Sequence, residues 1–322
     1  MSLQIPILFL IFNRPDETRR VLVEIRRSQC SRLYVAADGP RANVPSDLDQ
    51  CQYARALVGE LQGTVPVRAL FRKENLGCKD AVSSAINWFF QHEEEGIILE
   101  DDCLPQPGFF DYCAWALRTY RAASDVWHVS GMGVNRGDSA SVAFTALPFI
   151  WGWATWRDRW AQYSSAIPAA QQTVREMLRT VWKSGALVDY WAEKLRAVAE
   201  GTLDTWDYQW LYTIWKNGGL SLTPPDSFVQ NIGFGRDATH TTGNPECQYA
   251  PLYERSWAPP SVAPKALRDQ SLERRIYKDV FSLDLGLSGS FARAVQSTPA
   301  GRYIWLGLRR RFAASLSPRR GA

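Results

Sequence analysis

The first 131 residues alternate between short apolar runs and segments with helical spacing, and this alternation constrains the fold more than any other feature. Residues 5–12 are apolar throughout, which is typical of a strand buried on both faces of a sheet covered by helices. The expected strands cover residues 5–12, 33–37, 65–71, 96–100 and 126–131. This order predicts a Rossmann-like α/β fold with a mixed, mostly parallel sheet flanked by helices.

Polar or charged residues follow each of the first four expected strands. The clusters are Asn13 with Arg14, Asp38, residues 72–75, and Glu100 with Asp101 and Asp102. Because ligands of open α/β sheets bind outside the carboxyl ends of the strands, these clusters are expected to line one site. Neither the dinucleotide glycine fingerprint nor the P-loop pattern occurs, so side chains and metal are expected to hold the ligand.

Three consecutive carboxylates end the fourth expected strand, and Pro105 and Pro107 stop any regular element soon afterwards. Clustered acids at a strand end can hold a divalent metal or a polar ligand, and hard oxygen ligands suit Mg²⁺ or Mn²⁺. The alternative is a solvated acidic turn. The acids alone do not decide between these interpretations.

The composition of the 322 residues argues against several classes of protein. A net charge of +4 is mild and gives no case for nucleic-acid binding. The six Cys are scattered without a C-x-x-C pair, which argues against structural zinc and is typical of free thiols in a reducing compartment. No apolar run reaches the ~20 residues of a membrane span, and no signal peptide is recognised. A cytoplasmic protein, soluble or peripheral at the inner membrane face, is expected.

The second part of the chain differs from the first in composition and in the spacing of its apolar residues. Residues 149–156 are aromatic and broken by a glycine, residues 171–200 have helical spacing, and residues 233–243 are polar and glycine-rich. The end of the chain is basic. The expected units are a main domain at 1–245, with halves at 1–131 and 132–245, and a C-terminal extension with a basic tail at 246–322.

Several motifs together resemble those of GT-A-type inverting glycosyltransferases. They are the first strand ending in Asn13 and Arg14, Asp38, residues 100–102 with the helix after them, residues 129–135, the Gly-Trp turn at 149–153, and Trp206 with Asp207. Over roughly residues 5–240 the sequence is similar to the N-acetylglucosaminyltransferase family of complex N-glycan branching and to bacterial family-2-like glycosyltransferases. The resemblance implies a GT-A fold with a nucleotide-sugar-binding half and a helical, loop-rich acceptor half. Cys103 departs from the family pattern, where an aliphatic residue follows the acids.

The resemblance and the position of each group imply roles for individual residues. Arg14 is expected to contact the nucleotide, Asp38 to read its base and Asp101 to face the ribose. Asp102 is the expected metal ligand, with Glu100 behind it or on the ribose. The complete set of expected donor-binding residues is Asn13, Arg14, Asp38, Asn75, Lys79, Glu100, Asp101, Trp151, Gly152, Trp153 and Trp206.

Asp207 is the expected catalytic base. Glycosyl transfer requires that the acceptor hydroxyl lose its proton and that the departing diphosphate be stabilised, and a divalent metal meets the second need. Trp206 and Trp210 flank Asp207, and a low-dielectric setting raises the pKa of a carboxyl and makes it a better base. A single base opposite the leaving group implies inversion at the anomeric carbon. The alternative role for Asp207 is a helix N-cap.

Other positions keep two interpretations each. His240 is expected either to bind the metal or diphosphate or to lie at the surface. Lys79 can reach a phosphate or be a solvated residue in the first turn of a helix. The rings of Trp151 and Trp153 can form a sugar platform or pack in the core.

The predicted function is an inverting glycosyltransferase, dependent on Mn²⁺ or Mg²⁺, that moves a sugar from a UDP-linked donor to a hydroxyl of a glycan or lipid-linked acceptor. The alternatives are a sugar nucleotidyltransferase, a nucleotide-sugar hydrolase and a non-catalytic nucleotide-sugar-binding protein. Residues 303–312 combine aromatic and aliphatic residues with Arg, which suits an interfacial helix at anionic lipid or a plain basic tail.

Overall fold

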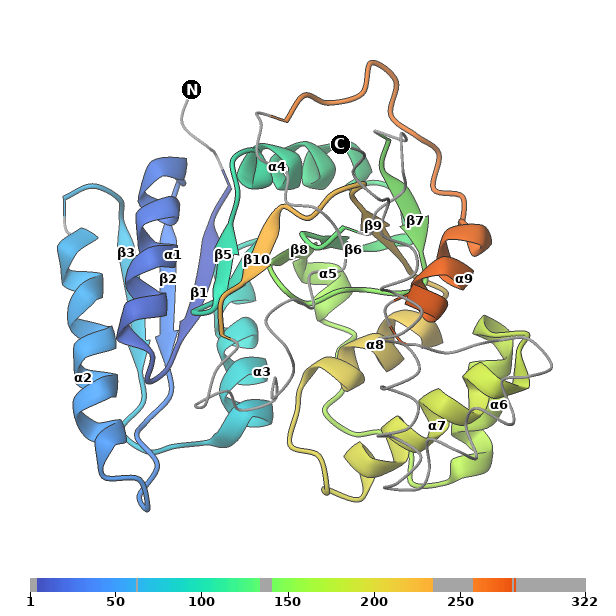
Figure 1. Cartoon of the computed structure of the whole chain (residues 1–322), viewed down its shortest axis with the longest axis horizontal. Helices are drawn as coiled ribbons and strands as arrows, with labels where there is room; N and C mark the ends of the chain where they lie inside the picture. Colours follow the sequence, from blue (N-terminus) through green and yellow to red (C-terminus); the bar gives the residue numbers. More distant parts are fainter. Residues whose placement is uncertain (1–4, 62, 134–140, 234–256, 280, 282–322) are drawn as a thin grey trace, which may run out of the picture.

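The computed structural model describes residues 5–61, 63–133, 141–233, 257–279 and 281, and an eight-stranded sheet forms its centre (Figure 1). In spatial order the strands are β3 (Val67–Phe71), β2 (Leu33–Ala37), β1 (Ile7–Ile11), β4 (Glu95–Glu100), β8 (Trp153–Trp156), β6 (Val126–Ser130), β9 (Leu220–Thr223) and β7 (Ala143–Thr145). The first four strands of this order are parallel, β8 is antiparallel to both its neighbours, and β7 is antiparallel to β9. The expected Rossmann-like α/β class with a mixed, mostly parallel sheet is confirmed.

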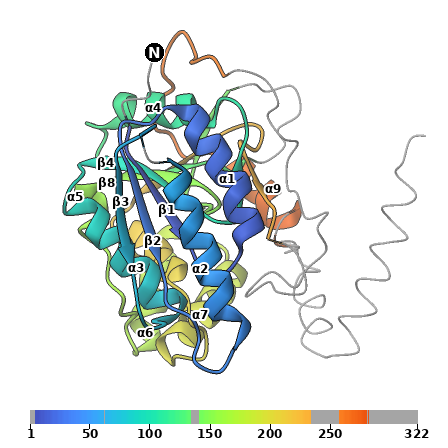
Figure 2. The same cartoon turned by 90° about the vertical axis from the view of Figure 1, so that its left-hand side faces the viewer.

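Helices cover both faces of this sheet, as the continuously apolar β1 predicts. Ile7, Phe9 and Ile11 pack on one face, while Leu8 and Leu10 pack on the other. The first face is covered by α1 (Pro15–Ser28), α2 (Ser46–Val58) and α4 (Phe109–Tyr120), and the second by α3 (Gly77–Phe90), α5 (Arg157–Trp160) and α8 (Asp207–Lys216). Figure 2 shows α1 and α2 on one side of β1, β2 and β3, with α3 and α5 on the other.

Local sequence explains where the first helix forms. Pro15 lies at its start, where the missing N–H costs no hydrogen bond. Asp16 and Glu17 lie in the first turn and Arg26 and Arg27 in the last, so their charges oppose the helix dipole at both ends. The chain therefore leaves β1 and enters α1 within a few residues, which holds the intervening polar residues at the carboxyl edge of the sheet.

A second core packs beside β7. It is built from α6 (Gln171–Val181), α7 (Gly185–Ala199), α8 and α9 (Gln270–Asp279) around Trp182, Trp191 and Trp215. A separate two-stranded ladder pairs β5 (Cys103–Pro105) with β10 (Val229–Asn231), and a short 3₁₀ turn, η1 (Gly59–Leu61), follows α2. In the described part of the chain, no helix is long and apolar enough to cross a membrane.

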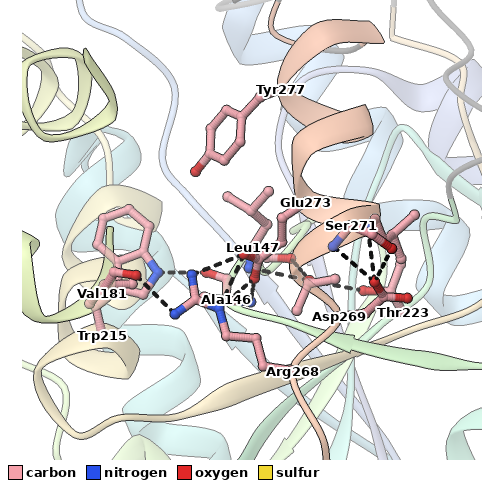
Figure 3. A network of polar contacts seen from close by, with 12 residues as sticks. Ala146, Leu147, Val181, Trp215, Thr223, Arg268, Asp269, Ser271, Glu273 and Tyr277 are labelled. Atoms are coloured by element: carbon pink, nitrogen blue, oxygen red, sulfur yellow. Dashed lines mark hydrogen bonds and ion pairs between the residues drawn. The ribbon is translucent and has the colours of Figure 1, made fainter. Parts of the chain in front are cut away.

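Residues 257–279 pack against the rest of the described chain through the second core, and the division predicted at residue 245 stays a prediction. Leu272, Ile276 and Tyr277 are buried in the second core. Arg268 forms a two-pronged ion pair with the buried Glu273, which also accepts a 2.6 Å hydrogen bond from the N–H of Ala146 (Figure 3). The expected basic tail, including residues 303–312, lies outside the described residues.

Candidate functional site

The acid triplet lies at the carboxyl edge of the sheet, where β4 ends. Glu100 is the last residue of β4, and Asp101 and Asp102 form the turn that leads into β5. Asp101 Oδ2 accepts a 3.0 Å hydrogen bond from the N–H of Phe12, directly after β1. The triplet is therefore fixed against the end of the neighbouring strand, as the positions of the first polar clusters predict.

Arg14 and Asp102 form a close ion pair at this edge. Arg14 Nη1 lies 2.7 Å from Asp102 Oδ2 and 3.7 Å from Asp101 Oδ1. Burial acts to lower the pKa of Arg14, but the two carboxylates outweigh it and raise that pKa above the ordinary value. Two predicted donor-site residues and the predicted metal ligand are thus in direct or near contact.

Gly233 closes over this ion pair from the end of β10. A Cβ atom at Gly233 would lie 2.2 Å from Asp102 Oδ2 and 2.9 Å from Arg14 Nη1. The N–H of Ile232 also donates a 2.8 Å hydrogen bond to the carbonyl of Asp102. The chain therefore needs glycine here, because any side chain would displace the pair below it.

The first two carboxyls of the triplet, Glu100 and Asp101, resist ionisation. Burial raises the pKa of Glu100 well above its ordinary value, and the carboxylates of Asp102, Asp101 and Asp207 raise it further, against the opposing effect of Arg14. Burial and the neighbouring Asp102 raise the pKa of Asp101 to about 7. The charge of Asp207 acts on Glu100, although 107 positions separate the two in the sequence, and the role of Asp207 as a base stays a prediction.

Asp207 is the first residue of α8, and its carboxylate is oriented by its neighbours. Asp207 Oδ1 accepts hydrogen bonds from the hydroxyl of Thr205 and, at 2.9 Å, from the N–H of Tyr208. Burial followed by the charge of Asp207 raises the pKa values of Tyr163 and Tyr208. The charge of this carboxylate therefore acts on both phenols as well as on Glu100.

Asp38 holds the turn that precedes α3. Its oxygens accept hydrogen bonds from the N–H groups of Gly39, Leu76 and Gly77 at 2.9–3.2 Å and from Asn75 Nδ2 at 2.9 Å. Burial raises the pKa of Asp38 despite these donors. The geometry gives Asp38 and Asn75 a clear part in shaping the edge, and their contact with a nucleotide base stays a prediction.

Asn13 belongs to a polar network with Asp47 and Arg41, two residues that the motifs did not single out. Asn13 Nδ2 donates to Asp47 Oδ1 at 2.8 Å, and the almost fully buried Asp47 also pairs with Arg41 at 2.6 Å. The Arg41 side chain donates the hydrogen bond that most lowers the pKa of Asp47. Arg41 also lies over the ring of Phe12, 5.5 Å from its centroid. The sequence alone does not single out Asp47, because only the fold brings it to Asn13.

Asp204 is a further residue that sequence reasoning missed. Its carboxylate accepts the N–H of Cys78 at 3.0 Å and of Lys79 at 3.3 Å, in the first turn of α3. A signal was present: Leu76 stands at the N-cap position of α3, and its side chain has no acceptor, so the cap had to come from elsewhere. Lys79 is thus placed in that first turn, and its contact with a phosphate stays a prediction.

The aromatic residues of the predicted site divide by burial. Trp153 is fully buried and stacks with Trp206 at 5.6 Å, and Trp206 itself is only 2% exposed. These rings pack in the core, which is one of the two interpretations given for Trp153, and a donor contact of either ring stays a prediction. Trp151 is half-buried, and Gly152 has a φ of +62°, a backbone conformation that favours glycine. A donor contact stays a prediction for Trp151 and Gly152.

The triplet can contribute to a metal site only together with a ligand. Among the described residues, no group of three or more His, Cys, Asp or Glu side chains is arranged to hold a metal ion. Mg²⁺ and similar cations, however, are often held by one or two carboxylates plus phosphates and waters. Asp102 as such a carboxylate stays a prediction: Oδ2 pairs with Arg14 and Oδ1 lies 3.6 Å from Cys103 Sγ, so a cation bound there would compete with these contacts. His240 lies outside the described residues.

Comparison with known proteins shows no family for this chain. No protein-family model and no curated protein matches the sequence. A UDP-glucose pyrophosphorylase complexed with UDP-glucose is similar at 10% identity and a TM-score of 0.26, over 44% of this chain and 66% of that chain. A 4-diphosphocytidyl-2C-methyl-D-erythritol synthase from Anaerococcus prevotii is similar at 7% identity and a TM-score of 0.27, over 50% and 76%. The chain thus spans just under two thirds of the pyrophosphorylase, and the function has to be argued from the site.

Proposed function

We propose that this chain is an inverting glycosyltransferase that moves a sugar from a nucleotide-sugar donor, UDP-linked by our reading, to a hydroxyl of a glycan or lipid-linked acceptor. The observation that supports the proposal is the position of Asp207 at the start of α8, three residues after Asp204, whose carboxylate accepts the N–H groups of Cys78 and Lys79 in the first turn of α3. In this proposal, a base from the acceptor half acts together with the acids and the Arg14 cation of the donor half.

The donor half would bind the nucleotide diphosphate. Arg14, held at the edge by Asp102, supplies a positive charge beside the acids, and guanidinium groups bind phosphate oxygens well. When bound, a divalent cation shared between Asp102 and the phosphates would stabilise the negative charge of the leaving diphosphate. The turn at residues 75–77, fixed by Asp38, completes this edge.

The acceptor half would supply proton transfer. Asp207 accepts the proton of the acceptor hydroxyl as that oxygen bonds to the anomeric carbon, and the bond to the diphosphate breaks on the opposite face. The hydroxyl of Thr205 and the N–H of Tyr208 orient the carboxylate for this step. One base acting opposite the leaving group gives inversion.

The proposal is tested by product analysis. Purified protein is incubated with a panel of nucleotide sugars, Mn²⁺ or Mg²⁺ and candidate glycan acceptors, and the released nucleotide is identified. Glycosyl transfer releases a nucleoside diphosphate and an elongated acceptor, whereas a nucleotidyltransferase releases pyrophosphate. Release of nucleoside diphosphate without an elongated acceptor would indicate a hydrolase, and absence of donor binding by calorimetry would favour a non-catalytic protein.

A further inference from the structure

The first turn of α3 is capped by two carboxylates that come from different halves of the chain. Asp38, after β2, accepts the N–H groups of Leu76 and Gly77. Asp204, which precedes α8, accepts the next two, those of Cys78 and Lys79. The contact between Asp204 and Cys78 spans 126 positions of sequence. One helical turn therefore fixes a loop of the acceptor half directly against the donor edge.

Glycine makes this close approach possible. Gly77 has a φ of +80°, and a Cβ atom there would lie 2.9 Å from Asp204 Oδ2. The absence of a side chain leaves room for the carboxylate at the helix N-terminus, where the dipole favours a negative charge. Asp204 thus occupies a position that suits it sterically and electrostatically.

The short segment from Asp204 to Asp207 is fixed along its length. The hydroxyl of Thr205 donates to Asp207, and Gln209 Nε2 donates to the carbonyl of Thr205 at 2.7 Å. Tyr163 donates its hydroxyl to the carbonyl of Trp206 at 3.2 Å, and the Trp206 ring is buried. A shift at Asp204 is therefore passed to Asp207 three positions later, because few torsions between them are left to absorb it.

We propose that Asp204 is a positioning residue that sets the location of Asp207 relative to the donor edge. The inference rests on the proposed glycosyl transfer, in which Asp207 is the base. Asp38 and Asp204 both accept hydrogen bonds from the first turn of α3. Their contacts with four consecutive backbone N–H groups therefore fix the position of one half of the site relative to the other. Asp204 itself touches neither donor nor acceptor in this role.

The test compares Asp204→Ala and Asp204→Asn with a matched control, Asp269→Ala. Asp269 caps α9 in the same manner, accepting the N–H groups of Ser271 at 3.1 Å and Leu272 at 2.9 Å, far from the acid triplet in sequence and on a different helix. Asp204→Ala should lower kcat about 10- to 100-fold with donor KM unchanged, since small displacements of a catalytic group cost that much. Asp204→Asn, which keeps one acceptor oxygen, should recover much of the loss. Asp269→Ala should lower Tm by about 2–4 °C and leave kcat unchanged.

Amide hydrogen exchange provides a readout that does not depend on activity. Asp204→Ala should speed exchange at Cys78 and Lys79 and in a peptide covering residues 203–209, whereas Asp269→Ala should not. Faster exchange with an unchanged kcat would overturn the positioning role, as would equal losses of kcat in both alanine variants. If the wild-type protein transfers no sugar, the proposed function fails by itself, and unchanged exchange at residues 203–209 in Asp204→Ala would independently refute the registration of the two halves.

Discussion

The indole N–H of Trp210 donates a 3.2 Å hydrogen bond to Nδ1 of His128, which joins α8 to β6 beneath the candidate site. His128 Nε2 lies 2.9 Å from the carbonyl oxygen of Phe149. Because Nδ1 accepts the indole N–H and the carbonyl can only accept, the proton of the ring lies on Nε2 and the ring is neutral. The ring is fully buried and stacks on Trp153 at 4.9 Å. Burial lowers the pKa of His128 to about 3. The helix that carries Asp207 is thus anchored by a histidine that must stay neutral.

This histidine should make the fold sensitive to acid. An unfolded His titrates near pH 6.5, so between about pH 6.5 and pH 3 the unfolded chain binds a proton that the folded chain excludes. Stability is therefore lost as the pH falls through this window, and His128 should account for a decrease of about 2 kcal/mol in the free energy of unfolding from pH 7 to pH 5. Urea denaturation at several pH values measures it. His128→Gln should remove this part of the slope and His92→Gln, at an exposed position, should keep it; the reverse result would refute the assignment.

Asp102→Asn should weaken donor binding in the presence of Mn²⁺ by about tenfold or more, because the neutral amide is a poor ligand for a hard cation. Calorimetry with and without Mn²⁺ separates the metal-dependent part of the affinity. Asp49→Asn, at an exposed position on α2, is the matched control and should bind as the wild type does. Equal metal dependence in wild type and Asp102→Asn would exclude Asp102 as the ligand.

Asp207→Asn should retain donor binding and lose transfer, with kcat reduced by about 10²- to 10⁴-fold, since an amide cannot accept the hydroxyl proton. Single-turnover kinetics and calorimetry on the same preparation measure both quantities. Asp111→Asn, on the exposed side of α4, should leave both unchanged. Transfer at the wild-type rate by Asp207→Asn would rule out its role as base.

Gly233→Ala should weaken donor binding without unfolding the protein. The added methyl group would stand 2.2 Å from Asp102 Oδ2, so either the carboxylate or Arg14 must move, and we expect about a tenfold loss of donor affinity. Gly185→Ala is the control, because its Cβ would meet no atom within 4 Å. Donor titrations by thermal shift compare the two variants, and equal affinities would show that the ion pair does not contribute to donor binding.

Glu273→Ala should destabilise the fold by about 3 kcal/mol, because it leaves the guanidinium of Arg268 and the buried N–H of Ala146 without their shared acceptor. Asp189→Ala removes the partner of Arg175 in an exposed ion pair and should cost less than about 1 kcal/mol. Chemical denaturation measures both. A small loss in Glu273→Ala would mean that residues 257–279 are not held to the domain through this contact.

The sheet and its edge could be read from the sequence because local patterns specify them. The apolar run at residues 33–37 coincides with β2, and the polar residues after β1 and β4 do meet at one edge. Strand order alone brings Arg14 to Asp102, once the strands are known to be parallel neighbours. The periodicity of apolar residues and the local composition were enough to predict these strands and the edge at which they end.

Contacts between distant segments could not be read in this way. Nothing in the local sequence of Asp204 states that its partners are the N–H groups of Cys78 and Lys79, and nothing near Asp47 points to Asn13. The burial of Trp153 and Trp206 likewise depends on their stacking with one another across 53 positions. Aromatic residues in a glycine-broken stretch suit a sugar platform and a core equally, and only the packed structure separates them.

The shared first turn of α3 also bears on the order in which the molecule is completed during synthesis. The chain leaves the ribosome N-terminus first, so β1, β2, β3 and α3 emerge well before residue 204. Until then the N–H groups of Cys78 and Lys79 have no cap from Asp204, and Asp38 alone caps the first turn of α3. In a nascent chain that ends before Asp204, the acids at the carboxyl edge of the sheet would lie beside a first turn of α3 that lacks the contacts of Asp204. The edge becomes complete only when the segment that carries Asp207 arrives, so its two chemical functions would be assembled together.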